Sequence, residues 1–172
     1  IVVLGRTKSK NKVDYSKGRY PEVLSKYTKG ITDQIYSARV GELAGLTQFG
    51  VNKTILPPGS ATALIHWHER EDEFVIIVSG TATLIDGDVE QELRPGDCAG
   101  FKAGVPSGHA ILNRSEEDVV LFEIGTRAPL EVGHYPGVDL EYGSESYENK
   151  RVFRFSNLDG KEVFSASREI FK

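Results

Sequence analysis

The sequence has few of the features that cross-link a chain or attach it to a membrane. Its 172 residues include one cysteine, Cys98, so an internal disulfide is excluded and we expect a reducing, cytoplasmic compartment. No apolar run reaches the roughly 18 residues of a membrane span, and the apolar residues 1–4 are too few for a signal peptide. Methionine is absent, which is compatible with a sequence trimmed at its start and leaves a removed targeting segment as an open alternative.

Positive charge is also scarce. The net charge is −4, which argues against nucleic acid as a partner. Hydrophobic residues make up 39% and charged residues 27% of the chain, so wholesale disorder is excluded as well. The length fits one domain with arms.

The positive charge that is present gathers near the start. Residues 6–19 contain six lysines and arginines against one acid, Asp14. We interpret residues 1–44 as an N-terminal arm with a short helix that begins at Pro21 and ends before Gly30. A basic arm can bind anions or the acidic face of a partner. Because terminal segments are usually loosely held, we favour a solvated arm.

Residues 45–130 read as a domain of short strands. Runs rich in β-branched and aromatic residues alternate with turn sequences such as Pro57-Pro58-Gly59 and Pro95-Gly96-Asp97. Short strands at such regular spacing predict a sandwich or barrel. The expected strands are residues 46–56, 61–67, 73–78, 82–85, 89–93, 98–103, 109–113 and 119–124.

Residues 131–172 form a C-terminal extension in this interpretation. Residues 151–155 and 162–164 alternate polar and apolar around Asp159-Gly160, which predicts a β-hairpin. Residues 134–148 read as a polar, glycine-rich connection. Since an isolated hairpin is marginally stable, we expect it to pack on the barrel or on a second subunit.

The side chains suited to metal chemistry fall on the predicted strands. His66 and His68 are two residues apart, so in a strand both imidazoles point to one face and Trp67 points to the other. Glu73 begins the next strand, and His109 lies on a later one. Three imidazoles and a carboxylate suit a metal ion; the alternative is a set of surface or satisfied core histidines.

Two neighbouring carboxylates compete with Glu73 for this role. Glu71 and Asp72 lie in the polar turn before it, where we expect them to be solvated. Either could replace Glu73 if that turn is longer than the pattern suggests.

The spacing of these residues resembles the two motifs of the cupins, small barrels of the double-stranded β-helix (jelly-roll) type. The first motif corresponds to Gly59, His66-Trp67-His68, Glu73 and Gly80, with six rather than five residues between Gly59 and His66. The second corresponds to Gly96, Lys102-Ala103-Gly104, His109 and Asn113.

The second motif departs from the family pattern at two places. Lys102 stands where proline is usual, and Ser107-Gly108 resembles a two-residue insertion. Because two residues preserve strand parity, we expect His109 still to face inward.

The resemblance implies an all-β, double-stranded β-helix with an N-terminal arm and a C-terminal hairpin. It implies that His66, His68, Glu73 and His109 hold one divalent transition metal per chain, such as Zn, Fe, Mn or Ni, with one or two positions open to water or substrate. Because imidazole must be neutral to bind, we expect metal loss below about pH 6.

The function that follows is a metal-dependent enzyme acting on a small polar metabolite, an organic acid or a sugar. Cupins include dioxygenases, decarboxylases and isomerases. The alternative is a non-catalytic binding or sensor module, which the intact four-ligand set disfavours. Related single-domain cupins are commonly dimers, so we expect a homodimer that binds a small molecule and neither nucleic acid nor membrane.

Other residues have weaker expectations. We interpret His134 as structural or surface, Cys98 as a buried, inert strand residue, and Lys102 as pointing to solvent. The apolar walls of the barrel interior are expected from Val75, Ile77, Phe101 and Ile111.

Overall fold

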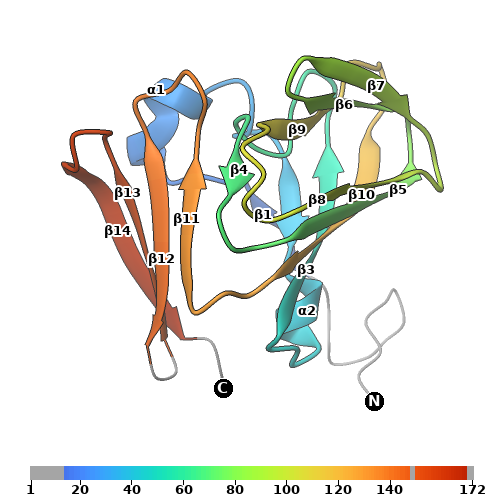
Figure 1. Ribbon diagram of the computed structural model, residues 1–172. Helices are drawn as coiled ribbons and strands as arrows, with labels where there is room; N and C mark the ends of the chain where they lie inside the picture. Colours follow the sequence, from blue (N-terminus) through green and yellow to red (C-terminus); the bar gives the residue numbers. More distant parts are fainter. Residues whose placement is uncertain (1–13, 148–149, 170–172) are drawn as a thin grey trace.

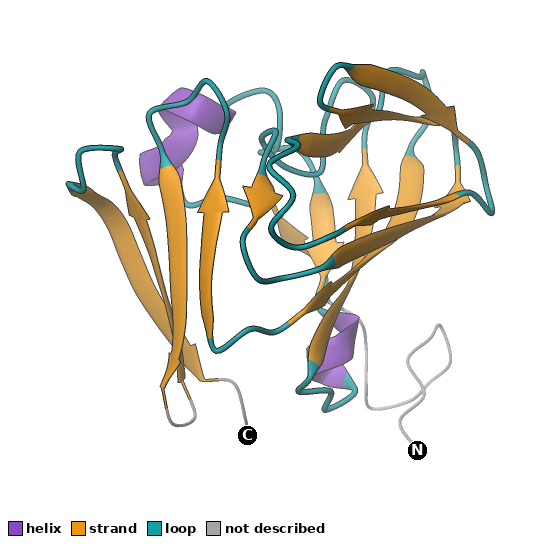
Figure 2. Cartoon of the chain, in the orientation of Figure 1, coloured by secondary structure: helices purple, strands orange, loops and turns teal. Residues whose placement is uncertain are grey.

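The fold is known from a computed structural model, in which residues 14–147 and 150–169 are described. Strands dominate it, and the helical segments are three short pieces near the start of the chain (Figure 2). The described strands form three sheets, of six, five and three strands. The prediction of an all-β protein is therefore confirmed.

Two of these sheets form the barrel (Figure 1). In the six-stranded sheet the order is β1-β2-β3-β10-β5-β8, and in the three-stranded sheet it is β7-β6-β9. The bounds are β1 (Ser16–Lys17), β2 (Tyr36–Ala38), β3 (Phe49–Leu56), β5 (Glu73–Ser79), β6 (Ala82–Asp86), β7 (Val89–Leu93), β8 (Cys98–Phe101), β9 (His109–Leu112) and β10 (Val119–Thr126).

The barrel core forms where strand alternation turns apolar side chains inward. Val75 and Ile77 lie two apart on β5 and are both buried, whereas Phe74 and Val78 are exposed on the other face. Ile111 and Leu121 bring the opposite strands into the same cluster. A truncation of either to alanine would cost about 2–5 kcal/mol of stability.

Gly80 shows why the first motif ends on glycine. It has a φ of +80° in the turn between β5 and β6, a backbone conformation that L side chains rarely adopt. A Cβ there would lie 2.6 Å from the carbonyl oxygen of Asp118. The close approach of the segment before β10 therefore requires glycine at this position.

The predicted strand over residues 61–67 is largely wrong. Only β4 (Trp67–His68) is a strand, while Ala61 and His66 form isolated bridges to the β9 segment. Between these bridges the Thr62 hydroxyl accepts the backbone N–H of Ile111 at 3.1 Å. This side chain takes the donor that a regular ladder would use, and the segment bends.

The C-terminal extension is a sheet rather than a lone hairpin. Its order is β14-β13-β12-β11-β4, with β11 (Leu130–His134), β12 (Glu141–Tyr147), β13 (Lys150–Ser156) and β14 (Glu162–Glu169). The predicted hairpin is present as β13–β14, but the predicted connection over 134–148 is wrong because β12 lies within it. The local sequence Gly143-Ser144 has little β-propensity, and pairing on both sides with β11 and β13 overrides it.

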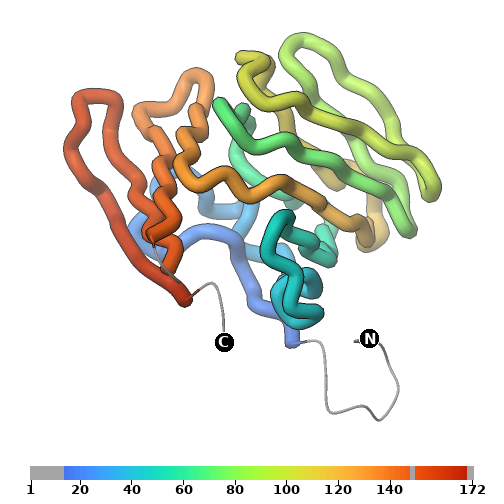
Figure 3. The backbone as a smooth tube through the Cα atoms, turned by 60° about the horizontal axis from the view of Figure 1, so that its bottom comes forward, coloured from blue at the N-terminus to red at the C-terminus, as the bar shows by residue number. Residues whose placement is uncertain are grey.

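The contacts of this sheet include the N-terminal segment of the same chain. In Figure 3 the orange and red C-terminal strands lie together on one side and the green and yellow barrel strands on the other. A second apolar cluster, separate from the barrel core, brings Leu24 of the N-terminal segment against Tyr135, Leu140 and Phe155. The expected short helix is present as η1 (Glu22–Leu24) and α1 (Ser25–Thr28), and α2 (Val40–Leu43) follows β2.

Only part of the basic arm lies within the described residues. Residues 6–13 fall outside them, whereas Ser16–Lys17 pair with β2 as strand β1. Among the described residues, no helix has the length and apolarity needed to cross a bilayer.

Candidate metal centre

The four side chains singled out from the sequence come together on Glu73. The His109 Nε2–H donates to Glu73 Oε2 at 2.8 Å. The Nε2 atoms of His66 and His68 lie 3.5 and 3.7 Å from the same oxygen. Three imidazole nitrogens from two separate segments thus surround one carboxylate, which is the arrangement the sequence predicted. Their role as metal ligands stays a prediction.

The two histidines of the first motif point to the same side because side chains alternate along extended backbone, even though the strand β4 is short. His66 and His68 both turn toward Glu73, and their rings meet edge to face at 5.0 Å. Trp67 turns away, as expected, and stacks on His134 at 4.2 Å. His134 also bonds Glu69 Oε1 at 2.9 Å, so its expected structural role agrees with its contacts.

Hydrogen bonds at the far nitrogens set the tautomers of these rings. His66 Nδ1 lies 2.8 Å from the Leu64 carbonyl oxygen, and His68 Nδ1 lies 3.2 Å from Glu131 Oε1. Both partners are acceptors, so Nδ1 carries a proton in each ring, and Nε2, the atom that faces Glu73, is the nitrogen left to bind a metal ion. Phe101 fixes His109 by stacking on its ring at 3.7 Å.

Glu131 contacts the cluster through His68, a position that the sequence did not reveal. Its side chain is fully buried on β11. Its carboxylate accepts the backbone N–H groups of Glu69 and Arg70 at 2.9 Å each, besides His68. It therefore joins the turn between His68 and Glu73, inside the first motif, to the C-terminal sheet. The one signal in the sequence is that this charged residue stands between two apolar ones, Leu130 and Val132.

The electrostatics of the cluster favour an ionised Glu73. Burial acts to raise the pKa of Glu73, but hydrogen bonds from His109 and His66 and the nearby charges of His66 and His68 outweigh it and hold that pKa well below the usual value. For His68, burial acts to lower the pKa, yet the hydrogen bond to Glu131 and the charges of Glu73 and Glu131 raise it. Each partner thus stabilises the charged form of the other.

The donor set fits a divalent transition metal. His66, His68 and Glu73 offer ligand atoms within 4.8 Å of one another, and His109 reaches the same carboxylate oxygen. Two of the imidazoles have an acceptor at the opposite ring nitrogen, as metal-bound histidines usually have. The mixture of nitrogen and oxygen ligands suits Zn, Fe, Mn or Ni and does not discriminate among them.

The neighbouring carboxylates take other roles. Glu71 is buried, so the expectation that it is solvated is wrong: it pairs with the buried Arg151 at 2.6 Å and accepts the backbone N–H of Ala128 at 2.9 Å. Glu71 also lies near His68 and Glu131, within 4.8 Å between ligand atoms. Asp72 is exposed, as expected, and accepts the Ala103 N–H at 2.8 Å.

A cavity of about 260 Å³ opens beside the cluster, between barrel and C-terminal residues. Its wall includes Arg19, whose Nη2 bonds both oxygens of Glu123 at 2.6 and 2.7 Å. The Thr54 hydroxyl donates to Glu123 as well. Arg19 had been placed in a solvated arm, and this is wrong for that residue because Glu123 draws it into the barrel. The lining side chains include Arg19, Arg39, Asn52, His66, His68, Glu71, Glu73, Glu123, Arg127, Tyr135, Tyr142 and Arg168.

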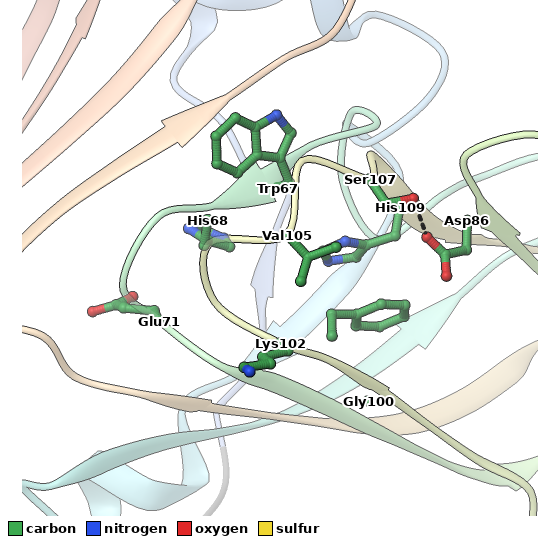
Figure 4. A pocket seen from close by; sticks show the side chains of 10 residues that line it. Trp67, His68, Glu71, Asp86, Gly100, Lys102, Val105, Ser107 and His109 are labelled. Carbon is green, nitrogen blue, oxygen red and sulfur yellow. Dashed lines mark hydrogen bonds between the residues drawn. The ribbon is translucent and has the colours of Figure 1, made fainter.

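A second hollow, of about 210 Å³, approaches His68 and His109 from the side of the β8–β9 loop (Figure 4). Lys102 is exposed at its rim, and Ser107 donates to Asp86 at 2.6 Å. Of the four expected wall residues, Phe101 lines this hollow, whereas Ile77 is buried in the packed core. Val75 and Ile111 line only a small space of about 20 Å³.

Contrary to the expectation from the sequence, Cys98 is not buried. It is exposed at the start of β8, and its Sγ contacts the Gly96 carbonyl oxygen at 3.6 Å. The alternation of β8 turns it outward, since Ala99 and Phe101 occupy the face that packs on the barrel core.

Comparisons with known proteins agree with this geometry. The model of the cupin domain family matches residues 52–125. A sugar phosphate isomerase of the cupin superfamily from Silicibacter pomeroyi is 34% identical, with 91% of this chain and 95% of that one covered and a TM-score of 0.77. A protein from Acidithiobacillus ferrooxidans assigned as a sugar phosphate isomerase is 25% identical, with 73% and 78% covered and a TM-score of 0.65.

A third structure shares the fold alone. It is a Thermotoga maritima protein predicted to be an oxalate decarboxylase, 19% identical over 72% of this chain and all of that one, with a TM-score of 0.54. No protein of curated function matches the chain.

Proposed function

The chain belongs to the cupin superfamily, and from that premise we propose that it is a metal-dependent isomerase of a small phosphorylated sugar. One observation carries the proposal: the imidazoles of His66, His68 and His109 surround Glu73 beside a polar cavity. The similarity to the Silicibacter sugar phosphate isomerase supports it, because the match extends over 91% of the chain and therefore well beyond the barrel.

His66, His68, Glu73 and His109 would hold the ion. When bound, it would act as a Lewis acid on a substrate oxygen and lower the cost of charge developing there. Glu131 and the Leu64 carbonyl keep the ring protons of His68 and His66 on Nδ1, so that Nε2 faces the cavity. The protein thus prepares the ligand atoms before the ion arrives.

An isomerisation also needs a group that moves a proton between adjacent carbons of the substrate. Among the carboxylates of the cavity wall, Glu73 belongs to the ligand set and Glu71 is occupied by Arg151. Glu123 is paired as well, with Arg19 and the Thr54 hydroxyl, which hold it in one orientation. Unlike Glu71, it also lines the small space between His66, Glu73 and His109. We assign it the proton transfer.

The test begins with protein purified without added metal, whose metal content is measured by elemental analysis. Aldose phosphates are then incubated in D₂O, and proton NMR follows both the conversion and the entry of deuterium beside the carbonyl. We expect one metal per chain, turnover and deuterium uptake. In His68→Ala both metal and turnover should be lost, whereas His134→Gln, a histidine outside the cluster, should keep both.

Two results would contradict the proposal. One is turnover by the metal-free His68→Ala protein. The other is a fully metal-loaded protein that binds aldose phosphates without converting them or exchanging deuterium, which would favour the binding module instead.

A further inference from the structure

Three arginines from distant parts of the chain meet at the cavity beside the metal cluster. Arg39 precedes α2, Arg127 follows β10 and Arg168 lies near the end of β14. None belongs to the ligand set. They line the same cavity as His66, His68 and Glu73.

The positive charge of this group is not balanced by its own neighbours. Arg127 Nη2 and Arg168 Nη1 share a single carboxylate oxygen, Oε1 of Glu42, at 3.5 and 3.1 Å. The nearby Arg151 is paired with Glu71 and does not change the balance. Within residues 14–147 and 150–169, these three guanidinium groups therefore have one paired carboxylate, a local excess of two positive charges in a chain whose net charge is −4.

This excess is costly in the absence of an anion. The side chains of Arg127 and Arg168 are only 28% and 24% exposed. Burial lowers the pKa of Arg127, and the charges of Arg168 and Arg151 lower it further. Burial likewise lowers the pKa of Arg168, with repulsion from Arg39 next. An anion between these groups would remove the repulsion.

The backbone is shaped around one of these arginines. Gly50 on β3 lies against the Arg127 guanidinium, and a Cβ at that position would sit 2.7 Å from Arg127 Cζ. A side chain at position 50 would push the guanidinium away, so its close approach to the strand depends on glycine. Arg127 is therefore seated in the wall of the cavity rather than free to extend into solvent.

We propose that Arg39, Arg127 and Arg168 form the subsite that binds the phosphate group of the substrate, with the reacting end of that substrate directed toward Glu73 and the histidines. The inference rests on the proposed function and adds the residues that select a phosphorylated substrate. A phosphate monoester carries about −1.5 to −2 charges at pH 7, which matches the local excess. Guanidinium groups also bind two phosphate oxygens at once.

The experiment is calorimetric titration with inorganic phosphate. Three proteins are compared: the wild type, the double variant Arg127→Gln/Arg168→Gln, and the matched control Arg154→Gln. Arg154 is an exposed arginine on β13, 3.9 Å from Glu162. We expect phosphate affinity to fall by about 100-fold or more in the double variant, since it removes two charged hydrogen-bond donors. The control should bind as the wild type does.

A charge-preserving variant distinguishes a specific loss of phosphate binding from a folding defect. Arg127→Lys/Arg168→Lys keeps both charges but not the planar fork, so it should bind phosphate more weakly than the wild type and more tightly than the glutamine variant. Equal phosphate affinity in the wild type and the glutamine variant would overturn the subsite, as would a wild type that does not bind phosphate.

Failure of the subsite and failure of the proposed function give different results. His68→Ala should still bind phosphate, because the three arginines lie outside the ligand set. If phosphate binds through the arginines but no sugar phosphate is converted, the subsite stands and the isomerase proposal fails. If the glutamine variant converts aldose phosphates as efficiently as the wild type does, the isomerase proposal stands and the subsite fails.

Discussion

Glu131 offers the sharpest test of the metal centre because it touches the centre without belonging to the ligand set. Its fully buried carboxylate accepts three hydrogen bonds: Oε1 from Glu69 N–H and His68 Nδ1–H, and Oε2 from Arg70 N–H. Glu131→Gln keeps the size of the side chain and one carbonyl oxygen. The amide NH₂ must then replace one acceptor, and the less damaging orientation turns it toward Arg70.

The expected loss of stability follows from this orientation of the amide. One charge-assisted hydrogen bond is lost, the Arg70 N–H is left facing a donor, and the other two bonds become neutral. Together these changes amount to about 2–4 kcal/mol of unfolding free energy. His68 keeps an acceptor at Nδ1 but loses the negative charge that makes Nε2 a stronger ligand, so we expect a metal affinity about 10- to 100-fold lower.

Urea unfolding of the metal-free protein measures the first effect and metal titration calorimetry the second. Glu145→Gln is the matched control, since Glu145 is an exposed carboxylate on β12, next to β11. The reasoning is refuted if Glu131→Gln unfolds at the same urea concentration as the control and binds metal as tightly. Loss of stability with unchanged metal affinity would refute the part that concerns His68.

The remaining predictions concern the proton carrier, a buried ion pair, pH and assembly. Glu123→Gln should lower kcat by about 100-fold with unchanged metal content; an unchanged kcat would remove Glu123 from the reaction. Arg151→Met should cost about 3–5 kcal/mol in urea unfolding because it leaves Glu71 buried without its partner, and adding Glu71→Gln should restore part of that loss. Because the imidazoles must be neutral to bind the ion, bound metal should be lost as the pH falls through about 6, and the raised pKa of His68 in the metal-free protein strengthens this competition by protons; metal retained at about pH 4 would contradict this. We expect a homodimer in light scattering at micromolar concentration, and a monomer would be evidence against it.

The sequence predicted the ligand cluster because its signals are local. His66 and His68 owe their common direction to a spacing of two, which survives even though only β4 is a regular strand there. The two-residue insertion before His109 preserves parity, so this ring still reaches Glu73. In such a motif the neighbours along the chain determine which way a side chain points.

What the sequence did not predict depends on pairing between distant segments. Strand β12 is polar and rich in small residues, and its conformation is set by two neighbouring strands that local pattern cannot supply. Glu71 sits in a polar turn that looks solvated, yet Arg151, 80 residues further along the chain, buries it. Arg19 likewise joins Glu123 across 104 residues. No spacing rule connects these positions.

The residues that the sequence predicted and those that it missed lie in different parts of the chain, which suggests that these parts have different roles at the site. The family match over residues 52–125 contains the whole candidate ligand set, so the predicted metal site belongs to the part of the chain that the cupin family shares. Arg39, Glu131 and Arg168 lie outside that range, and the latter two belong to the C-terminal sheet. The extended match to the Silicibacter isomerase includes most of the chain beyond the barrel. If the proposals hold, the barrel supplies the chemistry while the added segments tune the ion and choose the substrate, so variants in the added segments should change KM and substrate preference more than metal identity.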